Sequence, residues 1–210
     1  MFNPLYTEIN DVHSRLKQLG LTVDSLLNAI EQGYLSRTRL TAHHPKIFYG
    51  LSMWAETVAA LRDNLRPTSW FKVDDSNYEI TVNEDSTIAI AVTTGDENTG
   101  LAAFTPSNKC PKGAYTVDAV ATNQQLDLFA DLLPPPDEES CFTTWILLVH
   151  VAENEVRSEL SLPSEMVGGK IKTWKERIIL PTLPKEKSSI AIAPPDVPEI
   201  DVPVLRKSKA

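Results

Sequence analysis

Residues 95–113 form a long polar connection that contains residue types able to bind a ligand: Asp96, Glu97, Thr99 and Lys112. Its glycines superficially suggest a phosphate cradle, but neither the Gly-Lys-Ser/Thr ending of a P-loop nor a dinucleotide-binding Gly-x-Gly-x-x-Gly is present. Asp96 and Glu97 would also repel phosphate unless a divalent cation lay between them. A turn-rich connection is therefore the default interpretation. An enzyme or ligand site in this loop stays as an alternative, because long ordered loops often carry function.

No other residue pattern predicts a catalytic centre, a metal site or a cofactor. His43 and His44 are adjacent in a loop, and no cysteine, histidine or carboxylate stands at ligand spacing from them. The chain has no Gly-x-Ser-x-Gly elbow and no His-Glu-x-x-His motif. Its two cysteines, Cys110 and Cys141, make neither a disulfide framework nor a metal-ligand pattern. We expect no catalytic residue, no metal and no cofactor.

The pentapeptide Gln125-Leu126-Asp127-Leu128-Phe129 stands between a polar stretch and a proline-rich one. It resembles, position for position, the linear motif by which bacterial DNA-replication and repair proteins bind the sliding clamp of DNA polymerase. The usual form of that motif is Gln-Leu-Ser/Asp-Leu-Phe. The resemblance covers five of the 210 residues, and no whole-chain family is indicated.

The resemblance implies a role for each side chain of the pentapeptide. Leu128 and Phe129 would fill a deep apolar subsite of the clamp, Leu126 a shallower one, and Gln125 would hydrogen-bond at the entrance. Two large side chains buried at roughly 2 kcal/mol each give micromolar-scale binding after the costs of ordering the peptide. The partner implied is a protein, the sliding clamp.

A second interpretation of the same residues is a core helix. Leu126, Phe129, Ala130 and Leu133 fall at i, i+3, i+4 and i+7, which is the spacing of a core-facing stripe. In that case the pentapeptide ends a helix that begins near Thr116 and is not accessible to a partner. The solvent exposure of Phe129 separates the two interpretations.

The distribution of charge argues against direct nucleic-acid binding. The net charge is −8, and it is concentrated in residues 67–140, which contain thirteen acidic and three basic residues. Such a surface repels phosphate, whereas non-specific DNA binding depends on cationic groups that neutralise the backbone. We therefore expect a protein partner before a nucleic acid.

The sequence also argues against a membrane protein. The longest uninterrupted apolar run, at 145–149, is far shorter than the ~18 residues that a spanning helix needs. The first residues contain no basic region followed by an apolar stretch, so they do not predict a signal peptide. We expect a cytoplasmic protein that does not contact membranes, and the oligomeric state is left open.

Three helices are predicted in the first third of the chain from the spacing of apolar residues. The first contains Leu5, Ile9, Val12 and Leu16 and stops near Gly20. The second begins at a cap formed by Thr22 or Asp24 and ends at about 33, and the third spans roughly 49–65 before a proline.

Alternating and apolar runs then predict strands. They occupy 70–73, 78–82, 87–92, 142–151, 156–162 and 170–180, with turn-forming clusters at 74–77, 83–86 and 152–155. The fold class is therefore α+β, with N-terminal helices packed on a mainly antiparallel sheet of five or six strands. We expect a helical layer over 1–66, a β-rich part of the same domain over 67–180 with a stiff linker at 134–140, and a proline-rich extended tail over 181–210.

Three functions are consistent with these features. The leading hypothesis is a non-catalytic accessory or adaptor protein of bacterial, plasmid or phage DNA metabolism that docks on the sliding clamp through residues 125–129. The second is a subunit of a protein assembly that uses its apolar tail, since residues 190–205 are more apolar than a spacer requires. The third is an enzyme with its site in the 95–113 loop.

Overall fold

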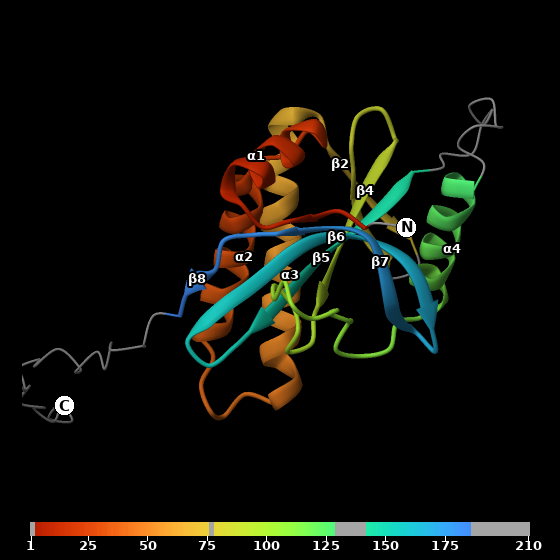
Figure 1. Ribbon diagram of the computed structural model, residues 1–210. Helices are drawn as coiled ribbons and strands as arrows, with labels where there is room; N and C mark the ends of the chain where they lie inside the picture. Colours follow the sequence, from red (N-terminus) through yellow and green to blue (C-terminus); the bar gives the residue numbers. More distant parts are fainter. Residues whose placement is uncertain (1–2, 76–77, 129–141, 186–210) are drawn as a thin grey trace, which may run out of the picture.

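The protein has an α+β fold, as the sequence predicts (Figure 1). The computed structural model describes residues 3–75, 78–128 and 142–185. In these residues eight strands form one mixed sheet, and four α-helices flank it, with helices on both of its faces. The predicted linker at 134–140 and the tail beyond 185 lie outside the described residues.

Three helices cover one face of the sheet: α1 (Ile9–Gln18), α2 (Val23–Thr38) and α3 (Lys46–Leu65). Thr22 caps α2 in a reciprocal pair with Ser25, whose backbone N–H donates to the Thr22 hydroxyl at 3.1 Å. The prediction that this helix ends near Gly33 is wrong. Gly33 lies inside α2 because the helix crosses α3 there, and a Cβ atom would meet the Thr57 hydroxyl at 2.0 Å.

The sheet has the strand order β1-β7-β6-β5-β4-β3-β2, and β8 pairs with β6. The long strands match the six predicted ones: β2 (Phe71–Asp75), β3 (Tyr78–Val82), β4 (Ile88–Thr94), β5 (Thr143–Val151), β6 (Glu155–Val167) and β7 (Lys170–Ile179). Among the described strands, β4–β5 and β1–β7 are parallel pairs and the others are antiparallel, so the sheet is mainly antiparallel.

The strand count exceeds the predicted five or six because of two short elements. They are β1 (Leu5–Tyr6) and β8 (Leu183–Pro184), and two residues are too few to produce an alternating pattern. Leu5 was expected in the first helix. It pairs instead with Arg177 of β7, and the first helix begins only at Ile9.

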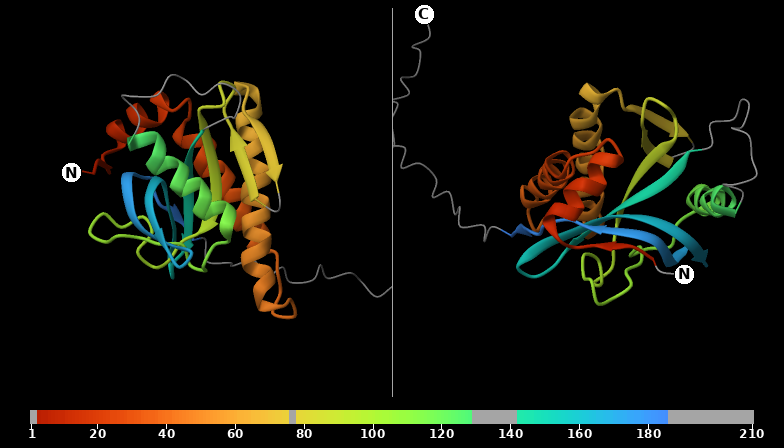
Figure 2. Two further views of the ribbon diagram at one scale, coloured as in Figure 1. Left: turned by 90° about the vertical axis from the view of Figure 1, so that its right-hand side faces the viewer. Right: turned by 45° about the horizontal axis from the view of Figure 1, so that its top comes forward.

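The two faces of the sheet carry separate apolar cores. The larger core joins α1, α2 and α3 to alternate residues of β4, β5 and β6, such as Val92, Leu147 and Leu160. The smaller core, on the other face, contains Ala91, Ile146, Ile171 and Trp174. Figure 2 shows α4 (Ala114–Leu128) across the sheet from the three N-terminal helices.

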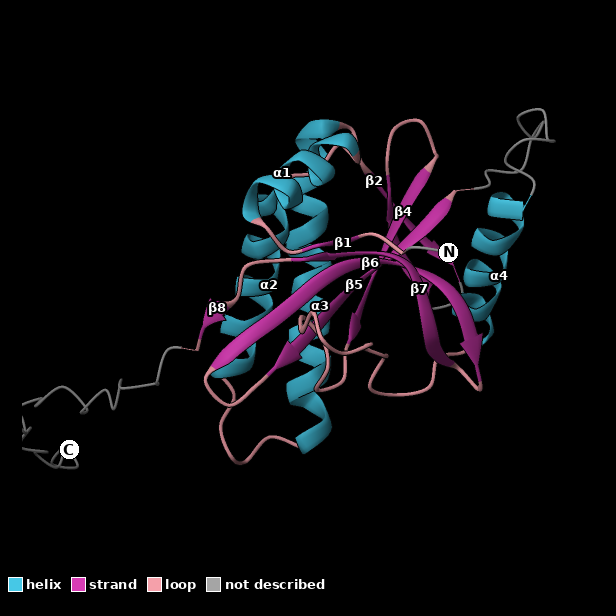
Figure 3. Cartoon of the chain, viewed as in Figure 1, coloured by secondary structure: helices cyan, strands magenta, loops and turns pink. Residues whose placement is uncertain are grey.

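The strand β6 is long and bent (Figure 3), and its bend positions α4. Register shifts against β7 occur between Leu162 and Met166, around Pro163, which cannot donate a ladder hydrogen bond. The β5–β6 pairing stops at Ile146 and Ser161. Beyond that point the buried side chain of Asn123 takes over: it accepts from the N–H of Thr144 at 2.8 Å and donates to the carbonyl of Thr144 at 2.9 Å.

Candidate functional site

The 95–113 connection is an ordered segment held by its own polar residues. The Asp96 carboxylate accepts hydrogen bonds from the backbone N–H groups of Asn98 at 3.2 Å and Ser107 at 3.0 Å. Thr99 is wholly buried, and its hydroxyl lies where a Cβ on Gly95 would sit. Asp96 therefore stabilises the loop by hydrogen bonds, and Thr99 stabilises it by packing against Gly95.

The four loop residues singled out in the sequence do not form one site. Lys112 lines a cavity that Asp96, Glu97 and Thr99 do not line. Glu97 has an exposed side chain, and its backbone carbonyl accepts a hydrogen bond from Arg157 at 2.7 Å. These four side chains therefore cannot hold a phosphate or a metal ion together.

A buried ion pair fixes the loop to the sheet. The wholly buried Glu159 of β6 accepts from the Arg177 guanidinium of β7, with Nη2 at 2.6 Å from Oε2, and also from the backbone N–H of Gly100 at 3.0 Å. Arg177 donates as well to the carbonyls of Phe104 at 2.7 Å and Leu101 at 3.1 Å. One charge pair thus joins two strands and three points of the loop, a structural role.

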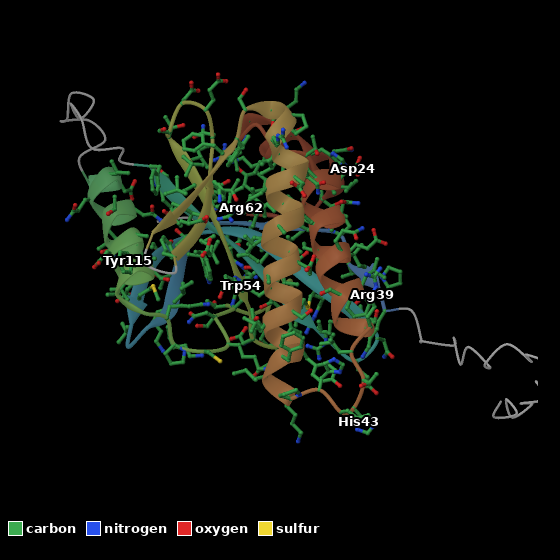
Figure 4. The ribbon with its side chains drawn as sticks, turned by 180° about the vertical axis from the view of Figure 1, so that it is seen from behind. Asp24, Arg39, His43, Trp54, Arg62 and Tyr115 are labelled. Carbon is green, nitrogen blue, oxygen red and sulfur yellow. The ribbon has the colours of Figure 1, made fainter. Side chains whose placement is uncertain are left out.

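A cavity of about 220 Å³ lies between α3, the ends of β3 and β4, and the start of α4. Figure 4 labels Trp54 on α3 and Tyr115 at the start of α4, with strands of the sheet between the two helices. The Tyr115 ring stacks on Tyr78 with centroids 6.4 Å apart, and the Trp54 indole donates to the Val92 carbonyl at 3.1 Å. Aromatic groups therefore supply much of the wall.

The cavity exists because β3 and β4 part there. Their pairing ends at Ile80 and Ala91, so Thr93 lies beyond the last residue of β4 that pairs with β3, although it still pairs with Leu148 of β5. Thr93 is only 4% exposed, and its hydroxyl has no hydrogen-bond partner among the described residues. A buried hydroxyl without a partner is costly in a folded protein, so this group is suited to a ligand atom.

Burial shapes the protonation of the groups around the cavity. Desolvation lowers the pKa of Lys112 below its ordinary value and raises the pKa of Tyr78 to about 12. Glu79 is the acidic residue in the lining, and its carboxylate accepts a hydrogen bond from Arg62 at 3.1 Å. The same Arg62 guanidinium also pairs with Asp74, and Lys112 is the cation among the residues that line the cavity.

Sequence reasoning named Lys112 but missed the other residues of this cavity. Trp54 lies in the helix predicted over 49–65 and Tyr78 in the strand predicted over 78–82, whereas Thr93 falls between the predicted strand at 87–92 and the 95–113 connection. The lining residues run from Trp54 to Ile171, which are 117 positions apart, so no local spacing joins them. A signal does exist in retrospect: two aromatic residues, Tyr78 and Tyr115, border turn-rich segments.

The pentapeptide lies at the C-terminal end of α4, the last helix before an undescribed stretch. Gln125 and Asp127 are exposed, and Leu126 is half-buried in a shallow hollow with Leu162 and Pro163. The side chain of Leu128 and the whole of Phe129 lie outside the described residues. The helical conformation of 125–128 is the one expected from the core-helix interpretation, while the exposure of Phe129 is not described.

The histidines do not gather into a site. His44 contacts Thr41 of its own loop, with Nδ1 at 3.0 Å from the Thr41 backbone nitrogen, and His150 has Nδ1 at 3.4 Å from the Gly95 carbonyl. Over 3–75, 78–128 and 142–185, no group of three or more metal-ligating side chains is found. Within the same ranges, no helix combines the length and apolar character that crossing a membrane requires.

Neither the family models nor the curated proteins nor the solved structures that were compared with the chain gave a match. The function must therefore be argued from this chain's own residues.

Proposed function

We propose that the protein is a cytoplasmic, non-catalytic accessory protein of bacterial, plasmid or phage DNA metabolism that docks on the polymerase sliding clamp through residues 125–129. The observation that carries the proposal is the five-residue match to the clamp-binding motif, with Gln125 and Asp127 exposed at the end of α4. In the motif, glutamine contacts the rim of the pocket, so its exposure is a requirement of the proposal.

The attachment of α4 supports release of the pentapeptide from the body of the protein. Asn123 anchors the helix through two hydrogen bonds to Thr144, two residues before the motif begins. After Asn123, the described polar contacts are an ion pair between Asp127 and Lys175 and a hydrogen bond from Gln124 to the Ser164 carbonyl. An exposed ion pair contributes about 0–1 kcal/mol, so the polar contacts described for the last turn of α4 hold it weakly.

The energy balance is compatible with micromolar docking. Unwinding the last turn gives up a few helix hydrogen bonds, each worth about 0.5–1.5 kcal/mol net, and the partial burial of Leu126. Burial of Leu128 and Phe129 in an apolar pocket contributes about 1.5–3 kcal/mol each, and clamp contacts to Gln125 and Leu126 add to that. The gain from burial minus the cost of unwinding is a net binding free energy of the size expected for a short peptide motif.

The first experiment is calorimetric titration of the full-length chain with a purified bacterial sliding clamp. We expect micromolar binding by the wild type and its loss in the Leu128→Ala/Phe129→Ala variant, with an unchanged melting temperature. The chain also offers a matched pair of glutamines. Gln125→Ala removes a motif residue and weakens binding, whereas Gln124→Ala removes its neighbour and does not.

A synthetic peptide of residues 122–133 provides the second arm. Binding by both the peptide and the full-length chain supports the proposal. Binding by the peptide alone means that the folded protein withholds the motif, and the proposal fails for this protein. Absence of binding by either one removes the sliding clamp as a partner.

A further inference from the structure

The start of α4 forms part of the wall of the cavity. Gly113 precedes the helix and has no side chain, and the first turn contains no acidic residue. The first backbone N–H groups of a helix have no partner within the helix and carry partial positive charge. Gly113, Tyr115 and Thr116 line the cavity, so the start of α4 that carries these donors forms part of its wall.

Two further donors belong to the same cavity. Lys112 immediately precedes the turn, and among the described residues its ammonium group has no ion-pair partner. The hydroxyl of Thr93 is buried without a partner in the described part of the chain. A helix terminus, a cation and an orphan hydroxyl all complement oxygen atoms that carry negative charge.

The remaining wall is aromatic and apolar. Trp54 and the stacked pair of Tyr78 and Tyr115 border the cavity, with Ile146 and Ile171 among its other lining residues. Its volume of about 220 Å³ lies below the ~300–1,000 Å³ of typical sites for drug-sized ligands. The space therefore suits a single ring with one charged group better than a nucleotide or a peptide.

We propose that this cavity binds a small aromatic oxyanion, with its carboxylate or phosphate at the first turn of α4 beside Lys112 and Thr93 and its ring against Trp54 and Tyr115. The site is separate from the pentapeptide, because it lies at the opposite end of α4. Docking on a sliding clamp and ligand binding here can each fail without the other.

The test is a titration of the ¹⁵N-labelled full-length chain, followed by amide correlation spectra. The probes are benzoate, phenyl phosphate and the neutral isostere benzamide. We expect saturable shifts of the amides of residues 113–116 and of the Trp54 indole with at least one anion, and none with benzamide. Tighter binding of benzoate identifies a carboxylate site, and tighter binding of phenyl phosphate identifies a phosphate site.

Two variants test the assigned donors. Lys112→Met keeps the length of the side chain but removes its charge, and we expect about a tenfold or greater loss of affinity. Thr93→Val keeps the shape of the side chain but removes the hydroxyl, and affinity should fall several-fold. Lys46→Met, at the exposed start of α3, is the matched control and should bind like the wild type.

The proposal is overturned if benzamide shifts the same resonances as the anions, if no probe saturates, or if both variants bind like the wild type. The spectra of the variants also report their folding. Should Lys112→Met lose its dispersed spectrum, the isosteric Thr93→Val variant decides, and an unchanged affinity in that variant overturns the assignment.

Discussion

The buried pair of Glu159 and Arg177 gives the sharpest prediction for stability. Replacing Arg177 by methionine keeps an apolar chain of similar length but leaves the Glu159 carboxylate wholly buried without its counter-charge. Two donors remain for that carboxylate, the Ser161 hydroxyl at 2.9 Å and the Gly100 N–H at 3.0 Å. We therefore expect Arg177→Met to lower the free energy of unfolding by about 3–5 kcal/mol.

Several contributions set that magnitude. An uncompensated buried charge accounts for most of it. The loop carbonyls of Leu101 and Phe104 also lose charge-assisted hydrogen bonds, but Phe104 is exposed and its carbonyl can bind water instead. A loss of this size is a large share of the 5–15 kcal/mol that stabilises an ordinary domain, so unfolding should be followed at low temperature.

Urea unfolding monitored by tryptophan fluorescence measures the effect, and hydrogen exchange at 100–107 locates it. Trp174 is a local reporter because its indole donates to the Pro106 carbonyl of the same loop at 2.9 Å. Lys175→Met removes an exposed ion pair and is the control, with an expected cost below about 1 kcal/mol. Glu159→Met combined with Arg177→Met should recover much of the loss. A cost under 1 kcal/mol for Arg177→Met, or a double variant less stable than the single one, would refute the reasoning.

Four further predictions concern single residues. Gly33→Ala should lower the unfolding free energy by about 1–3 kcal/mol in urea titrations, because the new Cβ would meet a hydroxyl oxygen of α3 at 2.0 Å. Asn123→Leu leaves both backbone groups of Thr144 without their partner, at about 1–3 kcal/mol for each, and should speed amide exchange in α4. Thr93→Val should raise the unfolding free energy of the ligand-free protein by about 1 kcal/mol, since it removes a buried hydroxyl without a described partner; a decrease contradicts the assignment. The pKa of Tyr78 is raised from 10.0 to about 12, so between these values the unfolded chain releases a proton that the folded protein keeps. Stability should therefore fall by roughly 2–3 kcal/mol as pH rises through that window, and Tyr78→Phe should lack this fall in unfolding curves at pH 9 and 11.5.

Much of the fold is predictable from the sequence because the periodicity of apolar residues reports which face is buried. Alternation in 78–82 and the apolar run in 145–149 identify strands that the structure contains. Gly33 was misassigned as a helix end, because a glycine that ends a helix cannot be distinguished in the sequence from a glycine at a helix crossing. Only the position of α3 shows which role applies.

The candidate sites differ in how far the sequence alone could predict them. The pentapeptide is a local pattern, so five adjacent residues are enough to raise the hypothesis of clamp binding. The cavity is not local, because Trp54, Thr93 and Lys112 come together only through the separation of β3 from β4 and the placement of α4. Glu159 likewise reads as an ordinary polar strand residue until Arg177 is placed beside it.

The helix α4 carries both proposed sites, one at each end, and Asn123 separates them. Because Asn123 replaces ladder hydrogen bonds between β5 and β6, it fixes the middle of α4 to the rigid part of the sheet. An oxyanion at the first turn then acts on a segment that is already held in place, and the anchor at Asn123 stops a change at the first turn from being passed along the helix to the last turn. The occupancy of the cavity should therefore leave clamp affinity unchanged in the wild type. In Asn123→Leu the two ends are joined only by the helix itself, so coupling between benzoate or phenyl phosphate and the clamp is expected to appear there first.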